Sequence, residues 1–345
     1  MVRFMKCFYK IVAVILCFVL GEIPVSAENG SAATFSVINL NVAGLPKWIT
    51  GNDSQSNQNE IGKQLTVGGY DIIAVQEDFG YHSNLTDNIS GYSYTTNHSG
   101  GVPAGDGLNL FSKYPIYNET RIPWNQTYGI LTDGSDELTP KGILYAVIEL
   151  EPGVYLDFYD IHADAYDDAG SRAARENNFK QLAELIVENS SRNDRPIIVT
   201  GDFNTYSHLD NSQNSNFCHY FYEQLGLKNA WTEICNGGDY EDYSKWSGDN
   251  WGKWDSVEMF LYKSSQGVEL SVTDFAYKFF TDENGVQLSD HAAAIAVFTY
   301  AKTAEFSEKS QNLQVVKAQP VKLFVRYIAN IFTDLMKIFQ IPKFI

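Results

Sequence analysis

Residues 196–204 read PIIVTGDFN, an apolar run that ends in a glycine, an aspartate and an asparagine. The run from Pro196 to Gly201 is short, rich in β-branched residues and bounded by turn residues, as buried strands are. Asp202 and Asn204 follow it directly, so we expect their side chains at the end of a rigid strand. Loops held by a sheet are a usual place for catalytic groups, and the segment therefore predicts a sheet that carries a functional site.

The same arrangement recurs along the chain. Further short apolar runs cover residues 35–42, 71–76, 142–150, 154–161, 257–262 and 292–298. The polar residues at their ends are Asn39, Asn41, Glu77, Asp78, His162, Asp164, Asp290 and His291. Residues 171–189 place apolar side chains on one face of a helix, with Ser171 as the expected N-cap. Strands mixed with helices, with no Pro- or Gly-rich linker between them, predict one layered α/β domain.

The polar residues at the strand ends carry more meaning as a set than alone. A single Asn or Asp in such a place is most often a turn or cap residue, because its side chain bonds to nearby backbone. Together they offer carboxylates for a hard metal ion, two histidines for proton transfer, and amides that donate to phosphate oxygens. The set therefore indicates chemistry on a phosphoester.

The order of these motifs resembles the endonuclease/exonuclease/phosphatase superfamily, also called DNase I-like. In chain order the motifs are INLNV (38–42), VQE (75–77), GLNLFSK (107–113), IHAD (161–164), GDFN (201–204) and SDH (289–291). The resemblance covers nearly the whole body of the chain. It implies a four-layered α/β sandwich, in which two packed mixed β-sheets are flanked by helices.

The resemblance also implies roles for the matching residues. Asn41 and Glu77 would bind a divalent metal, with Glu77 as the main carboxylate ligand; Mg²⁺ is expected, and Ca²⁺ or Mn²⁺ are alternatives. His291, oriented by Asp290, would be the general base that activates water. His162 would donate a hydrogen bond to the phosphoryl group, or protonate it or the leaving oxygen.

The remaining site candidates are less specific. By the same resemblance, Asp202 and Asn204 would position the phosphate and the nucleophile. Asn109 and Asp164 lie within matching motifs and are substrate-binding candidates. The superfamily commonly has an aspartate near residue 258; here Glu258 takes that position, and Asp255 is the alternative for its role.

The N-terminus predicts export. Arg3, Lys6 and Lys10 precede an apolar run at 11–20, and small residues follow at 25–27, so residues 1–27 read as a signal peptide. The apolar run falls short of the roughly 20 residues that span a bilayer. We therefore expect a secreted or extracellular protein, either free or associated with a membrane surface.

The cysteines follow from that location. Cleavage removes Cys7 and Cys17 and leaves Cys218 and Cys235 in an oxidising compartment, where a lone pair usually forms a disulfide. Two thiols without Cys or His at ligand spacing do not make a zinc site. We predict a Cys218–Cys235 disulfide.

Charge bears on the substrate. The chain carries −17; the leader holds +2 and residues 316–345 hold +4, which leaves −23 for residues 28–315. Nucleic-acid affinity rests largely on Lys and Arg, so an acidic body disfavours a nuclease. A phospholipid headgroup is the first choice of substrate, which implies a phosphodiesterase of sphingomyelinase type. A secreted acidic endonuclease or exonuclease is the alternative, and an inactive binding module on the same fold is the second alternative.

Two aromatic or apolar segments favour a lipid substrate. Trp246, Trp251 and Trp254 lie in one loop, where indoles suit either a membrane interface or the core. The catalytic domain is expected at residues 28–300, followed by a linker at 301–315. Residues 316–345 predict a basic amphipathic helix for peripheral membrane contact; docking on the body or on another chain is the alternative. The sequence implies no specific protein partner.

Overall fold

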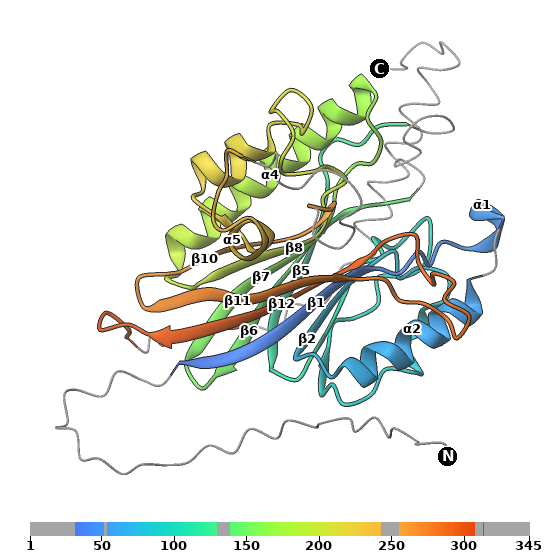
Figure 1. Cartoon of the computed structure of the whole chain (residues 1–345), viewed down its shortest axis with the longest axis horizontal. Helices are drawn as coiled ribbons and strands as arrows, with labels where there is room; N and C mark the ends of the chain where they lie inside the picture. The colour runs from blue at the N-terminus through green and yellow to red at the C-terminus, as the bar shows by residue number, and fades with distance from the viewer. Residues whose placement is uncertain (1–31, 52–53, 130–138, 243–254, 308–312, 314–345) are drawn as a thin grey trace, which may run out of the picture.

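The computed structural model describes residues 32–51, 54–129, 139–242, 255–307 and 313. Two β-sheets pack face to face, and helices lie on both outer sides (Figure 1). The predicted four-layered α/β sandwich is therefore confirmed. Within the described ranges, no helix has the length and apolar character needed to cross a membrane.

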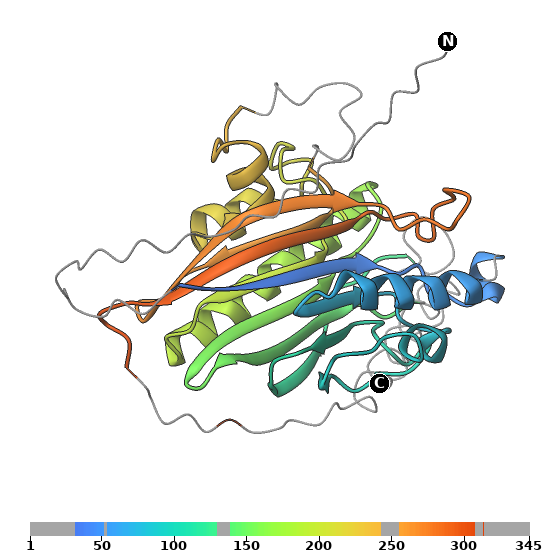
Figure 2. The same cartoon turned by 60° about the horizontal axis from the view of Figure 1, so that its bottom comes forward.

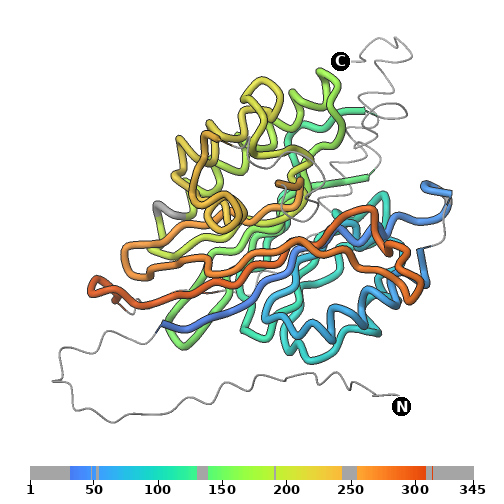
Figure 3. The backbone as a smooth tube through the Cα atoms, in the orientation of Figure 1, coloured from blue at the N-terminus to red at the C-terminus, as the bar shows by residue number. Residues whose placement is uncertain are grey.

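The first sheet joins the two ends of the domain. Its six strands have the order β11-β12-β1-β2-β4-β3, with β1 parallel to β2 and antiparallel to β12. The early and late segments β1 and β12 consequently lie side by side (Figure 3). The strands are β1 (Ala33–Asn41), β2 (Ile72–Gln76), β3 (Tyr94–Thr95), β4 (Asn109–Ser112), β11 (Val268–Lys278) and β12 (Ala293–Lys302).

The second sheet holds the middle of the chain. Its six strands have the order β5-β6-β7-β8-β10-β9, and β7 and β8 are its parallel pair. The strands are β5 (Ile116–Pro123), β6 (Gly142–Glu151), β7 (Val154–His162), β8 (Ile197–Asp202), β9 (Lys228–Asn229) and β10 (Glu258–Lys263). The predicted run from Pro196 to Gly201 is thus β8, shifted by one residue.

The helices are α1 (Lys47–Thr50), α2 (Gln55–Gly68), α3 (His82–Thr86), α4 (Ala169–Arg192), α5 (Ala230–Cys235) and the π-helix η1 (His219–Gln224). Helices α2 and α3 cover the outer face of the first sheet, and α4 and η1 cover that of the second (Figure 2). Helix α5 packs against the apolar cluster between the sheets. The expected N-cap of α4 was wrong. Asp168 caps this helix, because its carboxylate accepts the amides of Gly170 and Ser171, and the Ser171 hydroxyl donates to the same carboxylate.

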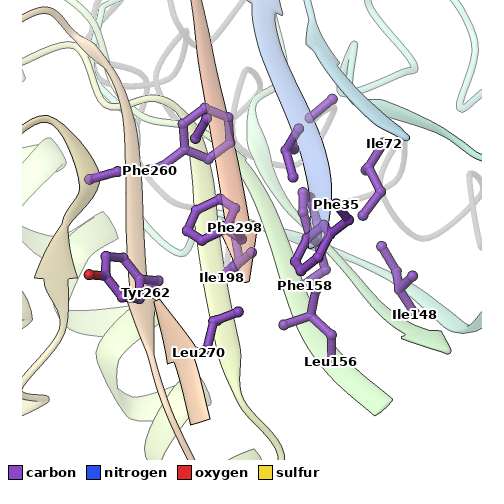
Figure 4. Close-up of a cluster of buried hydrophobic side chains, with 14 of the residues drawn as sticks. Phe35, Ile72, Ile148, Leu156, Phe158, Ile198, Phe260, Tyr262, Leu270 and Phe298 are labelled. Carbon is purple, nitrogen blue, oxygen red and sulfur yellow. The ribbon is translucent and has the colours of Figure 1, made fainter. Parts of the chain in front are cut away.

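Three apolar clusters fill the spaces between the layers. The central one lies between the two sheets, where Phe35, Phe158, Phe260 and Phe298 are almost fully buried (Figure 4). A second packs α4 and η1 on the outer face of the second sheet, and a third packs α2 and α3 on the first. Burial of this apolar area on both faces of each sheet fixes the strands, and hence the residues at their ends.

The predicted disulfide is absent. Cys218 and Cys235 are both free thiols. Cys218 packs against the cluster on the outer face of the second sheet, whereas Cys235 packs against the cluster between the sheets. Because opposite faces of one sheet separate the two surroundings, the thiols do not meet. Burial raises the pKa of both, to about 11 for Cys235.

Several predictions fall on other parts of the chain. The signal peptide at 1–27, the tryptophans of residues 243–254 and the C-terminal helix at 316–345 lie outside the described residues. Near the predicted domain boundary at residue 300, β12 continues to Lys302, and Phe306 and Leu313 pack against the central and outer clusters respectively.

Candidate active site

Asp202 lies at the centre of the candidate site. It ends β8, is buried, and pairs in register with His162 at the end of β7 and with Glu258 at the start of β10. Its Oδ2 accepts a hydrogen bond from Asn41 Nδ2 at 3.2 Å and lies 3.3 Å from His162 Nε2. The Nδ1 atom of His291 is 3.9 Å from the same oxygen. Both sheets therefore contribute to one polar cluster at their shared edge.

The backbone of β8 must approach β7 closely to form this cluster. Gly201 has φ +137°, and a Cβ atom there would lie 2.0 Å from the carbonyl oxygen of Ile161. Only glycine fits such a conformation and approach. The glycine of the GDFN motif thus has a packing reason, because it brings Asp202 beside His162.

Asp202 is an anionic anchor. Burial raises the pKa of its carboxyl, but the positive charges and hydrogen bond of His162 and His291 outweigh burial and leave the pKa below the usual range. Buried Lys141 lowers it further. The carboxylate therefore stays ionised and can hold imidazole and amide donors in place.

His291 is held by Glu258, contrary to the role expected of Asp290. Its Nδ1 is hydrogen-bonded to Glu258 Oε1, whereas the adjacent Asp290 is exposed. Glu258 is buried, and its other oxygen accepts from Ser256 Oγ at 2.7 Å. The longer side chain at the usual aspartate position therefore still reaches the histidine.

The charge around His291 favours its protonated form. Burial lowers the pKa of the ring, but the hydrogen bond to Glu258 and the charge of Asp202 raise it to about 10. Because Nδ1 faces Glu258, Nε2 is the nitrogen left for a substrate or water. The ring can thus take part in proton transfer while its orientation stays fixed.

Glu77 and Asn41 form the outer part of the site. Asn41 Nδ2 donates to Glu77 Oε1 at 3.1 Å as well as to Asp202, so two carboxylates converge on one amide. Glu77 adopts φ +58°, which is uncommon for a residue with a side chain, directly after β2. Gly44 permits this turn, since a Cβ there would meet the Glu77 carbonyl oxygen at 2.5 Å.

These residues fit a hard divalent cation. Carboxylate and amide oxygens are the donors that Mg²⁺ and Ca²⁺ prefer, and two convergent carboxylates leave negative charge for the ion to offset. Possible ligand atoms of Asp202, Glu258 and His291 also lie within 4.8 Å of one another. Because Glu258 and His291 are already hydrogen-bonded to each other, partly exposed Glu77 is the more open carboxylate. Asn41 beside it is buried, and its Oδ1, the atom that would bind an ion, now accepts the Ala43 amide at 3.0 Å.

His162 and Asn204 complete the cluster. The Asn204 amide N–H donates to Asp202 Oδ1 at 2.9 Å, and its side chain donates to the Ala163 carbonyl at 3.0 Å. His162 is buried and its carbonyl accepts from Trp124 Nε1. Its Nδ1 has no hydrogen-bond partner among the described residues. A buried ring nitrogen without a hydrogen-bond partner lowers the stability of the fold. Such groups in native proteins are often found at functional sites.

Three other predicted residues have different partners. Asp164 accepts the Tyr128 amide at 2.9 Å, and Asn109 donates to Asp78 at 2.7 Å. Asp255 accepts from Ser207 Oγ at 2.7 Å, so it does not take the place of Glu258. These hydrogen bonds fix the loops around the site, and none of them joins the Asp202 cluster.

Two residues near the site were not predicted as site residues. Ser289 Oγ donates to the Asn41 carbonyl at 2.7 Å and accepts the His291 amide at 3.1 Å, which ties the histidine loop to β1. Ser289 lies within the SDH motif, so a signal existed. Lys141 begins no motif, and nothing in the sequence distinguishes it from other lysines.

Comparison with known proteins agrees with this geometry. A model of the Endonuclease/Exonuclease/phosphatase family matches residues 38–258. A sphingomyelinase from Mycobacterium bovis is 31% identical over 300 residues, which cover 84% of this chain and 56% of that protein. The chain therefore spans about half the length of the curated relatives it matches.

Solved structures share the fold at lower identity. Sphingomyelinase C from Streptomyces griseocarneus has a TM-score of 0.54 and 17% identity, covering 77% of this chain and 99% of that one. A beta toxin variant from Staphylococcus aureus with bound magnesium ions has a TM-score of 0.54 and 17% identity, covering 76% and 99% respectively.

Proposed function

The chain belongs to the endonuclease/exonuclease/phosphatase family, and from that premise we propose that it is a metal-dependent phosphodiesterase that acts on phospholipid headgroups of the sphingomyelin type. The observation that supports this most directly is the sharing of Asp202 by Asn41, His162 and His291. It joins an open set of oxygen ligands to two histidines in one cluster, as hydrolysis of a phosphodiester by water requires.

The residues would divide the reaction as follows. In its neutral form, which the charge of a bound cation would favour over the imidazolium, His291 takes a proton at Nε2 from the attacking water, whose oxygen forms a bond to phosphorus. The bond from phosphorus to the leaving oxygen then breaks, and His162 donates the hydrogen bond or proton that this oxygen needs. Asn204 and Asp202 hold the phosphate and the two imidazoles in position. Glu77 and Asn41 would hold a divalent cation, most simply Mg²⁺, which supplies positive charge to offset that on the phosphoryl oxygens.

The lipid assignment rests on similarity and charge. The sphingomyelinase name belongs to the relatives from Mycobacterium and Streptomyces. Residues 28–315 carry −23, which opposes the approach of a polyanion such as DNA. A zwitterionic headgroup does not meet the same repulsion.

A substrate panel tests this proposal. Full-length mature protein is incubated with Mg²⁺ and sphingomyelin vesicles, other phospholipid vesicles, DNA, RNA and inositol phosphates. We expect choline-phosphate release from sphingomyelin, its loss in EDTA and its return with Mg²⁺. Hydrolysis of DNA or RNA without lipid turnover would instead assign the protein to the nucleases. Full activity in excess chelator, with metal removal verified, excludes the metal mechanism.

Export and membrane contact are further parts of the proposal. We propose that cleavage after Ala27 releases the protein and that residues 316–345 bind the lipid surface. N-terminal sequencing of secreted protein tests the first. Removal of 316–345 should lower vesicle binding and hydrolysis of bilayer substrate, but leave hydrolysis of a soluble phosphodiester unchanged. Loss of soluble-substrate activity would show that the segment belongs to the folded body.

A further inference from the structure

A second polar cluster lies directly beyond Glu77 in the sequence. Asp78 is buried, and its Oδ2 lies 2.7 Å from Nδ1 of His82, which begins α3. His98 Nε2 donates to the Asp78 carbonyl oxygen at 3.0 Å. The two imidazole rings stack with centroids 3.8 Å apart and planes 7° apart. Two stacked histidines therefore each form a hydrogen bond with Asp78, one with its side chain and one with its backbone.

Further hydrogen bonds fix the orientation of the Asp78 side chain. Asn109 Nδ2 donates to the same oxygen at 2.7 Å, and Arg121 Nη2 donates to Asn109 Oδ1 at 3.2 Å. Support of this kind holds a carboxylate in one orientation, as outer-shell partners do around metal ligands. The His82 side chain is 28% exposed, which leaves the cluster open to solvent on one side.

The local charge suits a cation. Arg121 is paired with Asp106 and Glu119, and Asp78 adds a further carboxylate, so these side chains together carry a net negative charge. A cation held by the two ring nitrogens and the Asp78 carboxylate would offset part of this negative charge.

We propose that Asp78, His82 and His98 form a second metal site, selective for a borderline transition ion of the Zn²⁺ type. Their possible ligand atoms all lie within 4.8 Å of one another. Two imidazole nitrogens and one carboxylate oxygen are the donor set of open zinc sites, with water as the fourth ligand. Mg²⁺ prefers oxygen donors, so the two sites on either side of the Glu77–Asp78 peptide differ in the ion they take.

Binding requires a small rearrangement of the rings. A tetrahedral ion with bonds of about 2.1 Å holds its ligand atoms roughly 3.4 Å apart. The lone pairs of parallel rings do not converge on one point, so one ring must tilt. His82 can do so because it lies on a short, partly exposed helix. The ion would replace the imidazole protons that now face Asp78.

Cobalt titration tests the site without relying on activity. Full-length protein is titrated with Co²⁺ in saturating Mg²⁺, and the visible bands of four-coordinate Co²⁺ are recorded. We expect one Co²⁺ per chain, displaced by Zn²⁺, and the same result in Glu77→Gln. This variant removes the proposed Mg²⁺ ligand, so the outcome does not depend on the phosphodiesterase proposal.

Histidine variants assign the ligands. His82→Gln and His98→Gln should each weaken Co²⁺ binding about tenfold or more, whereas His219→Gln should not. His219 is a matched control, because it also lies four residues from its acidic partner, Glu223, but on an exposed helix surface. Imidazole NMR signals of His82 and His98 should shift with Zn²⁺ in the wild type, which needs no variant. Absence of the visible bands, or bands and NMR shifts that do not involve His82 and His98, overturns the proposal.

Discussion

His291 Nδ1 is hydrogen-bonded to the carboxylate of Glu258, a residue 33 positions away, and not to that of its neighbour Asp290. The adjacent aspartate is exposed, whereas Glu258 is buried and is itself held by Ser256. A buried carboxylate with a fixed orientation can fix the tautomer of an imidazole, and an exposed one cannot. In the proposed mechanism we therefore assign the positioning role to Glu258.

We expect Glu258→Gln to lower kcat by roughly 10²–10⁴-fold, because the ring of His291 loses the partner that sets its tautomer. Asp290→Asn should change kcat by less than about threefold, since exposed charges contribute little. Because Glu258 acts through His291, and a general base is inactive when protonated, its loss should also move the acidic limb of the kcat pH profile and leave KM nearly unchanged. Equal effects of the two variants would return the role to Asp290.

The two histidines should differ in importance. We expect His291→Ala to lower kcat by about 10²–10⁴-fold, as removal of a general base does. His162→Ala should cost less, because the metal and Asn204 also act on the phosphate in the proposed mechanism. Steady-state kinetics on sphingomyelin vesicles measure both values. An unchanged kcat in His291→Ala would place the base elsewhere.

Much of this site could be predicted from the sequence, because its residues follow buried strands. Asn41, Glu77, His162 and Asp202 each end or follow a β-branched run, and parallel pairing brings such ends to one edge. The apolar runs that predict the strands thus also predict where the polar site residues lie.

The features that the sequence did not predict depend on contacts between residues that are far apart along the chain. Asp290 is adjacent to His291 along the chain, but it is the carboxylate of Glu258 that is hydrogen-bonded to the ring. Strand β11 was missed because it is an edge strand with an exposed, polar face, which hides the apolar run. The cysteines were paired by compartment alone, and the sheet between their surroundings could not be inferred from composition.

The pKa of His291 should depend on the metal. In metal-free protein we expect a pKa of about 10, measured from its imidazole NMR signals, and a lower value with Mg²⁺, since a nearby cation disfavours the imidazolium. The raised pKa of His291 stabilises the metal-free fold, and this stabilisation is complete at a pH below about 6.5, the pKa in the unfolded chain. It is lost as the pH rises through about 10. The unfolding free energy of wild type should accordingly approach that of His291→Gln over this range. A pKa near 6.5 without metal contradicts this reasoning.

Gly201→Ala should destabilise the protein by about 3 kcal/mol or more, measured by urea unfolding. The new Cβ would lie 2.0 Å from the Ile161 carbonyl oxygen, so β7 and β8 must separate. Gly285→Ala is the control, because Gly285 has φ +82° with nothing within 4 Å of a new Cβ. That variant should cost only about 1 kcal/mol of backbone strain. Equal costs would show that conformation alone, and not the close approach, requires glycine at 201.

The last prediction concerns Asp160, which is fully buried beneath the site in β7. Gln76 Nε2 donates to its Oδ1 at 2.6 Å and to Asn39 Oδ1 at 2.7 Å. Burial raises the pKa of Asp160 well above its usual value. Gln76 Oε1 and Asp160 Oδ2 both lack a partner among the described residues, and both are acceptors unless Asp160 carries a proton. We therefore expect a neutral carboxylic acid at this position.

A neutral Asp160 makes the fold less stable as pH rises. Below the unfolded pKa near 3.9 both states hold the proton; above it the unfolded chain releases the proton and the folded one keeps it, so unfolding becomes easier. Asp160→Asn keeps a neutral group in which an NH₂ donor and a carbonyl acceptor replace those of the carboxylic acid, and should raise the unfolding free energy at pH 7 by on the order of 1 kcal/mol. Its advantage should vanish near pH 4. Asp157→Asn, which removes the buried charge 2.8 Å from Arg195, should destabilise instead. If Asp160→Asn is destabilising and its effect does not vary with pH, then Asp160 is ionised in the folded protein and the buried proton does not exist.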